Sequence, residues 1–253
     1  EDLRYLGRPH AGADGPRAVS AARRAGFTNV SIDLIYGLPG STRAGLELRL
    51  ADALDACAPE HVSCYQLTYA EGTPLGREVA EGRVTPLSED EELEQFVAVH
   101  ETLERRGFFA YEVSNFALRK DLRSRHNLAY WRHVDYAGVG PGAHSFRWPD
   151  RWWNTRSVED YCARVEAGKS AAEGREILTL RQLSAEALML GLRTTDGIEL
   201  AAHRERFGED LAASKSEAFG RMVEEGLLVV DGLRARPTLK GLAVADSLAR
   251  ELM

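Results

Sequence analysis

Three segments of the sequence carry side chains that could bind a ligand. In the first, Asp33 stands within the apolar segment 29–36, shortly before the turn 37–40. A carboxylate in an apolar strand is costly unless it is paired or bound, and ligands dock at strand ends in parallel α/β sheets. Asp33 is therefore a candidate ligand-binding residue. The alternative, a structural Asp that accepts hydrogen bonds from backbone amides of the turn, stays open.

The second segment, residues 126–131, reads HNLAYW and is flanked by arginines. On a helix, His126 and Tyr130 would lie one above the other at i,i+4, with Trp131 beside them. A neutral imidazole can ligate iron, aromatic rings can lie against a flat macrocycle, and arginines can pair with carboxylates. Taken alone, these residues favour the plainer interpretation of an aromatic helix packed on a sheet, with His126 hydrogen-bonded.

The third segment, residues 138–145, reads GVGPGAHS. Its glycines would let the backbone approach a ligand closely, and they would equally suit an ordinary compact turn.

Several familiar catalytic and nucleotide-binding motifs are absent from the sequence. The segment 37–42, GLPGST, lacks the lysine of a P-loop, and no GxSxG, HExxH or GxGxxG motif is present. The three cysteines, Cys57, Cys64 and Cys162, are widely spaced and form no CxxC. We therefore expect buried thiols rather than disulfides or a complete metal site.

Composition indicates a globular protein. The 253 residues are 44% hydrophobic and 28% charged, with a net charge of −7. An acidic chain gives no electrostatic reason to expect nucleic acid or an anionic membrane as partner. No apolar run approaches the roughly 18 residues of a membrane span, and no secretory segment is recognisable. We expect a cytoplasmic protein.

The elements that must position these residues alternate between helix and strand over the first half of the chain. Alternation at this spacing predicts right-handed βα units and a parallel sheet. The strand at 29–36 is expected to be buried on both faces, and Ser88 and Glu91 begin a helix as a capping box with Leu93 on its inner face. Three parallel strands cannot close a barrel, so either the sheet is small and open or preceding strands are missing, and we favour missing strands. The expected strands span residues 29–36, 61–67 and 109–113.

The second half has a different character. Residues 116–155 are rich in Trp, Arg, His and Gly and predict a folded functional loop region rather than regular elements. Helices are expected at 179–192, 198–207 and 211–225, followed by a hairpin at Asp231-Gly232 and a closing helix. This pattern is typical of a small winged-helix-like module, for which we expect a packing role rather than DNA reading.

Five motifs occur in order along the chain. They are SIDLIYGLPGST (31–42), SCYQLTYAEGTPL (63–75), YEVSNFA (111–117), HNLAYW (126–131) and GVGPGAHS (138–145). Together they resemble the HemN/HemW group of radical S-adenosylmethionine proteins, over essentially the whole chain. This group includes oxygen-independent coproporphyrinogen III oxidases and heme chaperones. The motif HNLAYW resembles the HNxxYW motif associated with heme binding, which favours the chaperone branch.

The resemblance implies site residues. Arg8 and Asp33 match positions that contact S-adenosylmethionine, where a guanidinium can pair with the methionyl carboxylate and a carboxylate can accept from hydroxyl or amino groups. His126 matches the histidine proposed as the heme ligand of the group, so it is a candidate ligand of the heme iron. The heme motif is completed by Asn127, Tyr130 and Trp131.

One departure from the group is marked. The CxxxCxxC that binds the group's [4Fe-4S] cluster is absent from these residues. We expect that roughly the first third of the family's length is not in this chain, and that the chain alone is inert in radical chemistry. The resemblance implies the later half of a partial (βα)6 barrel in residues 1–115, an aromatic- and glycine-rich segment in 116–175, and a helical, winged-helix-like domain in 176–253.

The implied function is that of a heme chaperone, which binds heme and delivers it to acceptor proteins. Partners would be heme, a heme-accepting protein and a second copy of the chain. The alternative is an enzyme, an oxygen-independent coproporphyrinogen III oxidase that decarboxylates propionates through a deoxyadenosyl radical.

Overall fold

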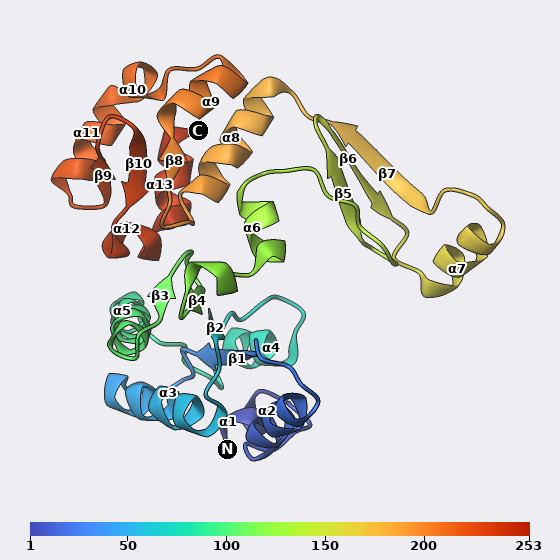
Figure 1. The fold of residues 1–253 in the computed structure, drawn as a ribbon, viewed down its shortest axis with the longest axis vertical. Coiled ribbons are helices and arrows are strands. Elements are labelled where there is room, and N and C mark those ends of the chain that lie inside the picture. Colours follow the sequence, from blue (N-terminus) through green and yellow to red (C-terminus); the bar gives the residue numbers. More distant parts are fainter. The chain divides into compact units, whose positions relative to one another are not determined.

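A computed structural model describes residues 1–253. The chain divides into two compact units, residues 1–123 and residues 124–253, and each is described by itself. Figure 1 colours the first unit from blue to green and the second from green to red. None of the helices combines the length and the apolar composition that crossing a bilayer would require.

The first unit alternates helices with short strands. Thr42 and Ser88 are N-caps, because each side chain accepts a hydrogen bond from a backbone amide in the first turn of its helix. Ser88 and Glu91 form the predicted capping box. The elements are α1 Asp2–Tyr5, α2 Asp14–Arg24, β1 Ser31–Tyr36, α3 Arg43–Cys57, β2 His61–Gln66, α4 Pro74–Ala80, α5 Glu89–Arg105, β3 Phe109–Ala110, β4 Asn115–Ala117 and a 3-10 turn Lys120–Leu122.

These strands form one four-stranded sheet in the order β1-β2-β4-β3. β1 and β2 are parallel, with Asp33 opposite Ser63. The predicted third parallel strand at 109–113 is wrong, because β3 pairs antiparallel with β4, and β4 pairs antiparallel with β2. The chain reverses directly after β3, where the Tyr111 amide donates to the Asn115 carbonyl at 3.2 Å, so no strand can continue to 113.

One face of this sheet is apolar and packs on α3 and α5. Side chains alternate along a strand, so Ile32, Leu34 and Tyr36 of β1 point to this face and join the core. Ser31 and Asp33 point to the other face and are exposed. The expectation that β1 is buried on both faces is therefore wrong.

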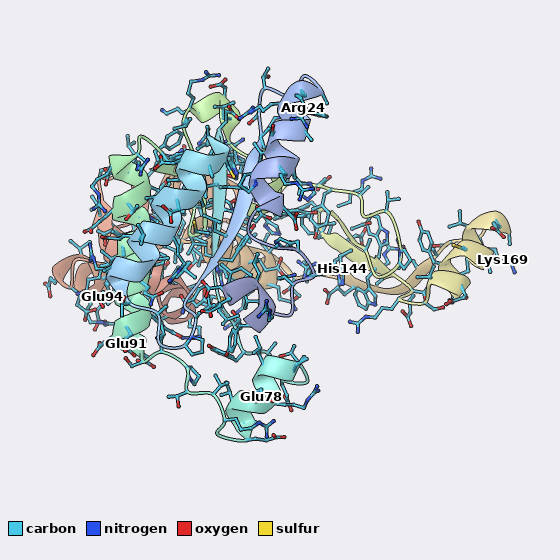
Figure 2. The ribbon with its side chains drawn as sticks, turned by 90° about the horizontal axis from the view of Figure 1, so that it is seen from below. Arg24, Glu78, Glu91, Glu94, His144 and Lys169 are labelled. Atoms are coloured by element: carbon cyan, nitrogen blue, oxygen red, sulfur yellow. The ribbon has the colours of Figure 1, made fainter.

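The helix α5 buries one stripe of residues, which includes Phe96, His100 and Leu103. The expectation that Leu93 lies on the inner face is wrong, because its side chain is 40% exposed and lies toward the outer face of the helix. Glu91 and Glu94 also lie on that outer side (Figure 2). The polar side of α5 therefore faces solvent, and its apolar side packs on the sheet.

The second unit contains two further sheets. One has the order β5-β6-β7 and the other the order β8-β10-β9, and both are antiparallel. The elements are α6 Arg125–Trp131, β5 His144–Arg147, β6 Asp150–Asn154, α7 Val158–Glu166, β7 Ala172–Ile177, α8 Leu180–Gly191, β8 Ile198–Glu199, α9 Leu200–Phe207, α10 Leu211–Ser214, α11 Ser216–Glu224, β9 Leu228–Val230, β10 Arg234–Pro237, α12 Leu239–Ala243 and α13 Ala245–Leu252.

The expectation of a loop region at 116–155 is wrong for much of its length. Besides α6, these residues form β5 and β6, which make a tight hairpin with Arg147 opposite Asp150. β7 adds a third strand, and α7 lies in the connection between β6 and β7 (Figure 1). Phe146 of β5 is 1% exposed and packs with Leu178, Leu183 and Phe207, so the sheet is anchored to the helices that follow it.

The last part of the chain has a core of its own. Its sheet β8-β10-β9 contains the predicted hairpin, in which Asp231 accepts hydrogen bonds from the amides of Leu233 and Arg234. Apolar residues between α8 and α13 form the centre, and Leu192, Leu211 and Leu252 are fully buried in it. The predicted order of helices, hairpin and closing helix is confirmed.

Candidate functional site

The first candidate site is a cavity of about 570 Å³ along β1 in the first unit. Arg8 and Asp33, both exposed, line it together. A guanidinium, a carboxylate and an apolar wall suit a ligand that carries a carboxylate and hydroxyl or amino groups beside an apolar portion. The apolar wall comprises Leu34, Tyr36, Leu46, Leu50 and Cys64.

The polar face of the sheet also holds a hydrogen-bonded chain that the sequence analysis missed. The Ser31 hydroxyl lies 2.7 Å from His61 Nδ1, and His61 Nε2 lies 2.8 Å from the Tyr111 hydroxyl. Burial lowers the pKa of His61, and the nearby Asp33 carboxylate acts in the opposite direction. Strand pairing creates this contact, because Ser31 stands opposite His61 in the register of β1 and β2.

The second candidate site is α6, which carries HNLAYW. Ser124 caps this helix by accepting from the Asn127 amide at 3.2 Å. The predicted vertical pairing of His126 and Tyr130 is confirmed, with ring centroids 4.8 Å apart and planes at 89°. Tyr130 in turn contacts Tyr136 at 4.7 Å and 77°. His126 is exposed and makes no hydrogen bond, unlike the hydrogen-bonded histidine of the plainer interpretation.

Trp131 faces a different environment from His126 and Tyr130. It lines a cavity of about 310 Å³ in the second unit, and its buried indole N–H has no hydrogen-bond partner. His126, Asn127 and Tyr130 do not line this cavity. The structure therefore divides the four motif residues between an exposed helix face and a cavity wall.

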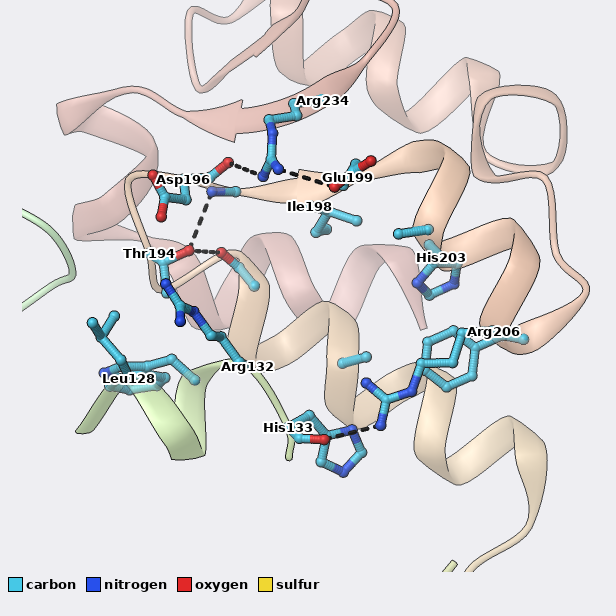
Figure 3. A pocket seen from close by; sticks show the side chains of 16 residues that line it. Leu128, Arg132, His133, Thr194, Asp196, Ile198, Glu199, His203, Arg206 and Arg234 are labelled. Carbon is cyan, nitrogen blue, oxygen red and sulfur yellow. Dashed lines mark hydrogen bonds and ion pairs between the residues drawn. The ribbon is translucent and has the colours of Figure 1, made fainter. Parts of the chain in front are cut away.

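The charged groups around that cavity are mostly engaged with the protein (Figure 3). Arg234 donates to Glu199 at 3.0 Å and to the Asp196 carbonyl at 3.2 Å. Arg206 donates to the His133 carbonyl at 2.9 Å and stacks over the Trp148 ring at 4.3 Å. These contacts give the arginines structural roles.

The glycine-rich segment 138–145 forms a compact turn whose amides bond within the chain. Gly138 donates to the Ser145 hydroxyl at 2.9 Å, and Gly142 donates to the Thr155 carbonyl at 2.7 Å. A Cβ on Gly138 would overlap the His144 carbonyl oxygen. Glycine is therefore required here by the protein's own backbone, which favours the compact-turn interpretation.

The residues present do not fit a [4Fe-4S] cluster. Cys57 and Cys64 are buried in the first unit, as expected, but the expectation of a buried thiol is wrong for Cys162, which is exposed on α7 in the second unit. No three Cys, His, Asp or Glu side chains converge in a way that could hold a metal ion. No step through a cluster can be derived from these residues.

Comparison with solved structures defines the class of fold. Coproporphyrinogen III oxidase (HemN) from Escherichia coli, described as a radical SAM enzyme, matches with a TM-score of 0.76 over 99% of this chain and 60% of its own. Sequence identity is 18%, so this likeness establishes a shared mixed α/β fold. Residues 178–244 match the family model of the HemN C-terminal domain.

Sequence relatives make the assignment more specific. The heme chaperone HemW of Mycobacterium tuberculosis is 34% identical over 99% of this chain, and HemW of Bacillus subtilis is 34% identical over 89%. A mitochondrial radical S-adenosyl methionine domain-containing protein 1 from Danio rerio is 33% identical over 98%. The chain belongs to this HemN/HemW group. It spans about three fifths of the relatives' length, namely 62%, 59% and 58% of these three.

Proposed function

We propose that the chain is a heme-binding part of a chaperone of the HemW type, which holds heme and passes it to acceptor proteins. The observation that carries this proposal is the exposed, unbonded imidazole of His126, packed edge-on against Tyr130 on α6. An imidazole of this kind can ligate heme iron, and the neighbouring rings can contact the porphyrin edge. The chaperone names of the HemW relatives support the same function.

The remaining residues of the heme motif have supporting roles in this proposal. Asn127 lies in the first turn of α6 beside His126, and its backbone N–H donates to the side chain of the N-cap residue Ser124. Trp131 offers an indole N–H that lacks a partner, so a carboxylate entering its cavity could accept that hydrogen. Arg125 makes no ion pair and stands next to His126, where it could meet a heme propionate.

The cavity along β1 is the proposed site for S-adenosylmethionine. Arg8 would pair with the methionyl carboxylate, and Asp33 would accept from ribose hydroxyls or the amino group. The cluster of the family finds no ligands among residues 1–253, so we assign this chain no radical step.

We also propose the finer architecture. Residues 1–115 would be later βα units of a partial (βα)6 barrel, 116–175 the segment with the heme motif, and 176–253 a winged-helix-like domain. A heme-accepting protein and a second copy of the chain are the proposed protein partners.

An enzymatic alternative has one observation in its favour, which is the fold shared with the Escherichia coli oxidase. Under this alternative, the intact protein would decarboxylate coproporphyrinogen III. Anaerobic conversion of coproporphyrinogen III by the intact protein would support the oxidase and refute the chaperone function.

The proposed function is tested by titrating ferric heme into the 253-residue chain and following the Soret band. We expect saturable binding and transfer of the bound heme to an apo-protein acceptor. His126→Ala should weaken binding about tenfold or more and shift the Soret maximum. Absence of saturable binding by the unaltered chain would refute the proposal, and an unchanged His126→Ala spectrum would remove His126 as ligand.

A further inference from the structure

A second cavity in the unit 124–253 lies beside α8, and we call it the α8 cavity. Its volume is about 440 Å³, which is within the range of small-molecule sites. One face of α8 forms a wall of this cavity, because its five lining residues follow the i, i+4 spacing of a single helix face. They are Leu180, Arg181, Ser184, Ala185 and Leu188.

The apolar part of the α8 cavity combines buried and exposed side chains. Leu188, Phe207 and Leu252 line it and are buried. Leu180 and Met253 also line it, but they are 53% and 48% exposed. An apolar group that covered these two side chains would remove their surface from water, which favours binding. The composition of this wall therefore favours an occupant with an apolar tail.

Two cations line the α8 cavity without an acidic partner. Arg181 and Lys215 make no ion pair and no side-chain hydrogen bond. Arg181 stands in the first turn of α8, which contains no acidic residue, and the helix dipole disfavours a cation at that end. Lys215 is half-buried. In a chain with 39 acidic and 32 basic residues, two unpaired cations at one cavity indicate that an anion completes it.

One acidic side chain of the lining restricts the charge of that anion. Glu209 accepts a hydrogen bond from the Ser184 hydroxyl at 3.4 Å and from the Ser214 hydroxyl at 2.9 Å. The Ser184 hydroxyl also lies 3.1 Å from Nε2 of the buried His203. Two cations and one carboxylate give the lining a single net positive charge. A singly charged head group therefore matches the cavity better than a doubly charged phosphate.

We propose that the α8 cavity binds a monocarboxylic acid with an apolar tail. The carboxylate would pair with Arg181 and Lys215, because guanidinium and ammonium groups form charge-assisted hydrogen bonds with carboxylates. The tail would cover the exposed side chains of Leu180 and Met253. The α8 cavity shares no lining residue with the cavity along β1 and contains no residue of the heme motif, so this proposal stands independently of the proposed function.

The test is a titration with sodium octanoate, followed by NMR of a chain labelled with ¹³C-methyl methionine. The three methionines are at positions 189, 222 and 253, and among them Met253 lines the α8 cavity. Octanoate should shift the Met253 signal saturably, whereas the signal of Met222, which is 1% exposed, should change little. Met253→Leu assigns the signal.

Matched ligands test recognition of the head group on the unaltered chain. Octan-1-ol has the same tail without a charge, and octyl phosphate is mostly doubly charged at about pH 8. Octanoate should bind about tenfold more tightly than octan-1-ol and at least as tightly as octyl phosphate. Added salt should weaken the binding of octanoate and leave that of octan-1-ol unchanged.

Variants test the two cations one at a time. Arg181→Gln and Lys215→Gln should each weaken octanoate binding about tenfold and leave octan-1-ol binding unchanged. Lys169→Gln is the matched control, because Lys169 (Figure 2) lies outside the lining of the α8 cavity and also makes no ion pair. Its affinity for octanoate should stay unchanged. Circular dichroism establishes that each variant is folded.

Four results would overturn the proposal. The first is the absence of a saturable Met253 shift with octanoate. The second is equal affinity for octanoate and octan-1-ol, which would show that the cations do not recognise the head group. The third is tighter binding of octyl phosphate, which would refute the singly charged head group. The fourth is an equal loss of affinity in Lys169→Gln and Arg181→Gln, which would show general electrostatic attraction instead of a site.

Discussion

The buried imidazole of His100 should make the first unit lose stability as the solution becomes acidic. His100 is 8% exposed and lies between Phe96 and Phe116, at centroid distances of 4.5 and 4.8 Å. Burial lowers its pKa from 6.5 to about 4, although a hydrogen bond to the Val113 backbone acts in the opposite direction. The native environment therefore disfavours the imidazolium form.

The sign and size of the effect follow from proton linkage. Between the two pKa values the unfolded chain binds more protons than the folded chain, so the free energy of unfolding falls as the pH falls. Between about pH 7 and about pH 5 this one residue should account for a loss of about 2 kcal/mol. His100→Leu removes the titrating group, and the variant should lack this portion of the pH dependence.

Hydrogen exchange of the α5 and β2 amides, measured at several pH values, can follow the first unit by itself. The four tryptophans are at positions 131, 148, 152 and 153, all in the second unit, so their fluorescence reports the other half of the chain and is the internal control. His61, whose pKa is also lowered, is present in both proteins and cancels in the comparison. Parallel pH profiles for the unaltered chain and His100→Leu would refute the reasoning.

Three further predictions concern other parts of the molecule. Asp33→Asn should weaken S-adenosylmethionine binding about tenfold in calorimetry, since it removes the charged acceptor from the cavity along β1, and equal affinity would contradict its assignment. Ser88→Ala breaks the capping box with Glu91 and should cost about 1 kcal/mol in denaturant unfolding of the first unit, with no change in tryptophan fluorescence. Gly138→Ala forces the turn away from the His144 carbonyl and should cost about 1–3 kcal/mol in the tryptophan-reported transition, whereas an unchanged midpoint would show that the turn adapts freely.

Local patterns in the sequence predicted the elements whose signals lie within a few residues. The capping box at Ser88 and Glu91, the hairpin at Asp231 and the parallel pair β1 and β2 all follow from short-range spacing. The reversal between β3 and β4 was not predicted, because residues 109–113 have the composition of one longer strand. In the structure Phe109 instead pairs antiparallel with Ala117, and the Tyr111 amide donates to the Asn115 carbonyl. Such pairing is decided by tertiary contacts that local propensity does not contain.

The same distinction applies to the candidate sites. His126 and Tyr130 are four residues apart on one helix, so their contact was predictable from spacing. The stack of His144 on Trp153 depends on the register of β5 and β6, and the contact of His61 with Tyr111 joins residues 50 positions apart. No local pattern encodes either contact.

The position of β1 at the end of the strand order has a practical consequence. Its backbone groups that face away from β2 have no neighbouring strand, so they offer a template on which another extended segment can pair. Natural proteins often place a charged residue on an edge strand, which disfavours pairing with another chain, and Asp33 is a charged residue on this strand. Asp33→Asn would remove the charge that disfavours pairing at this edge, so self-association should be measured before any loss of ligand binding is interpreted. Asp33→Glu, which keeps the charge, separates the two effects.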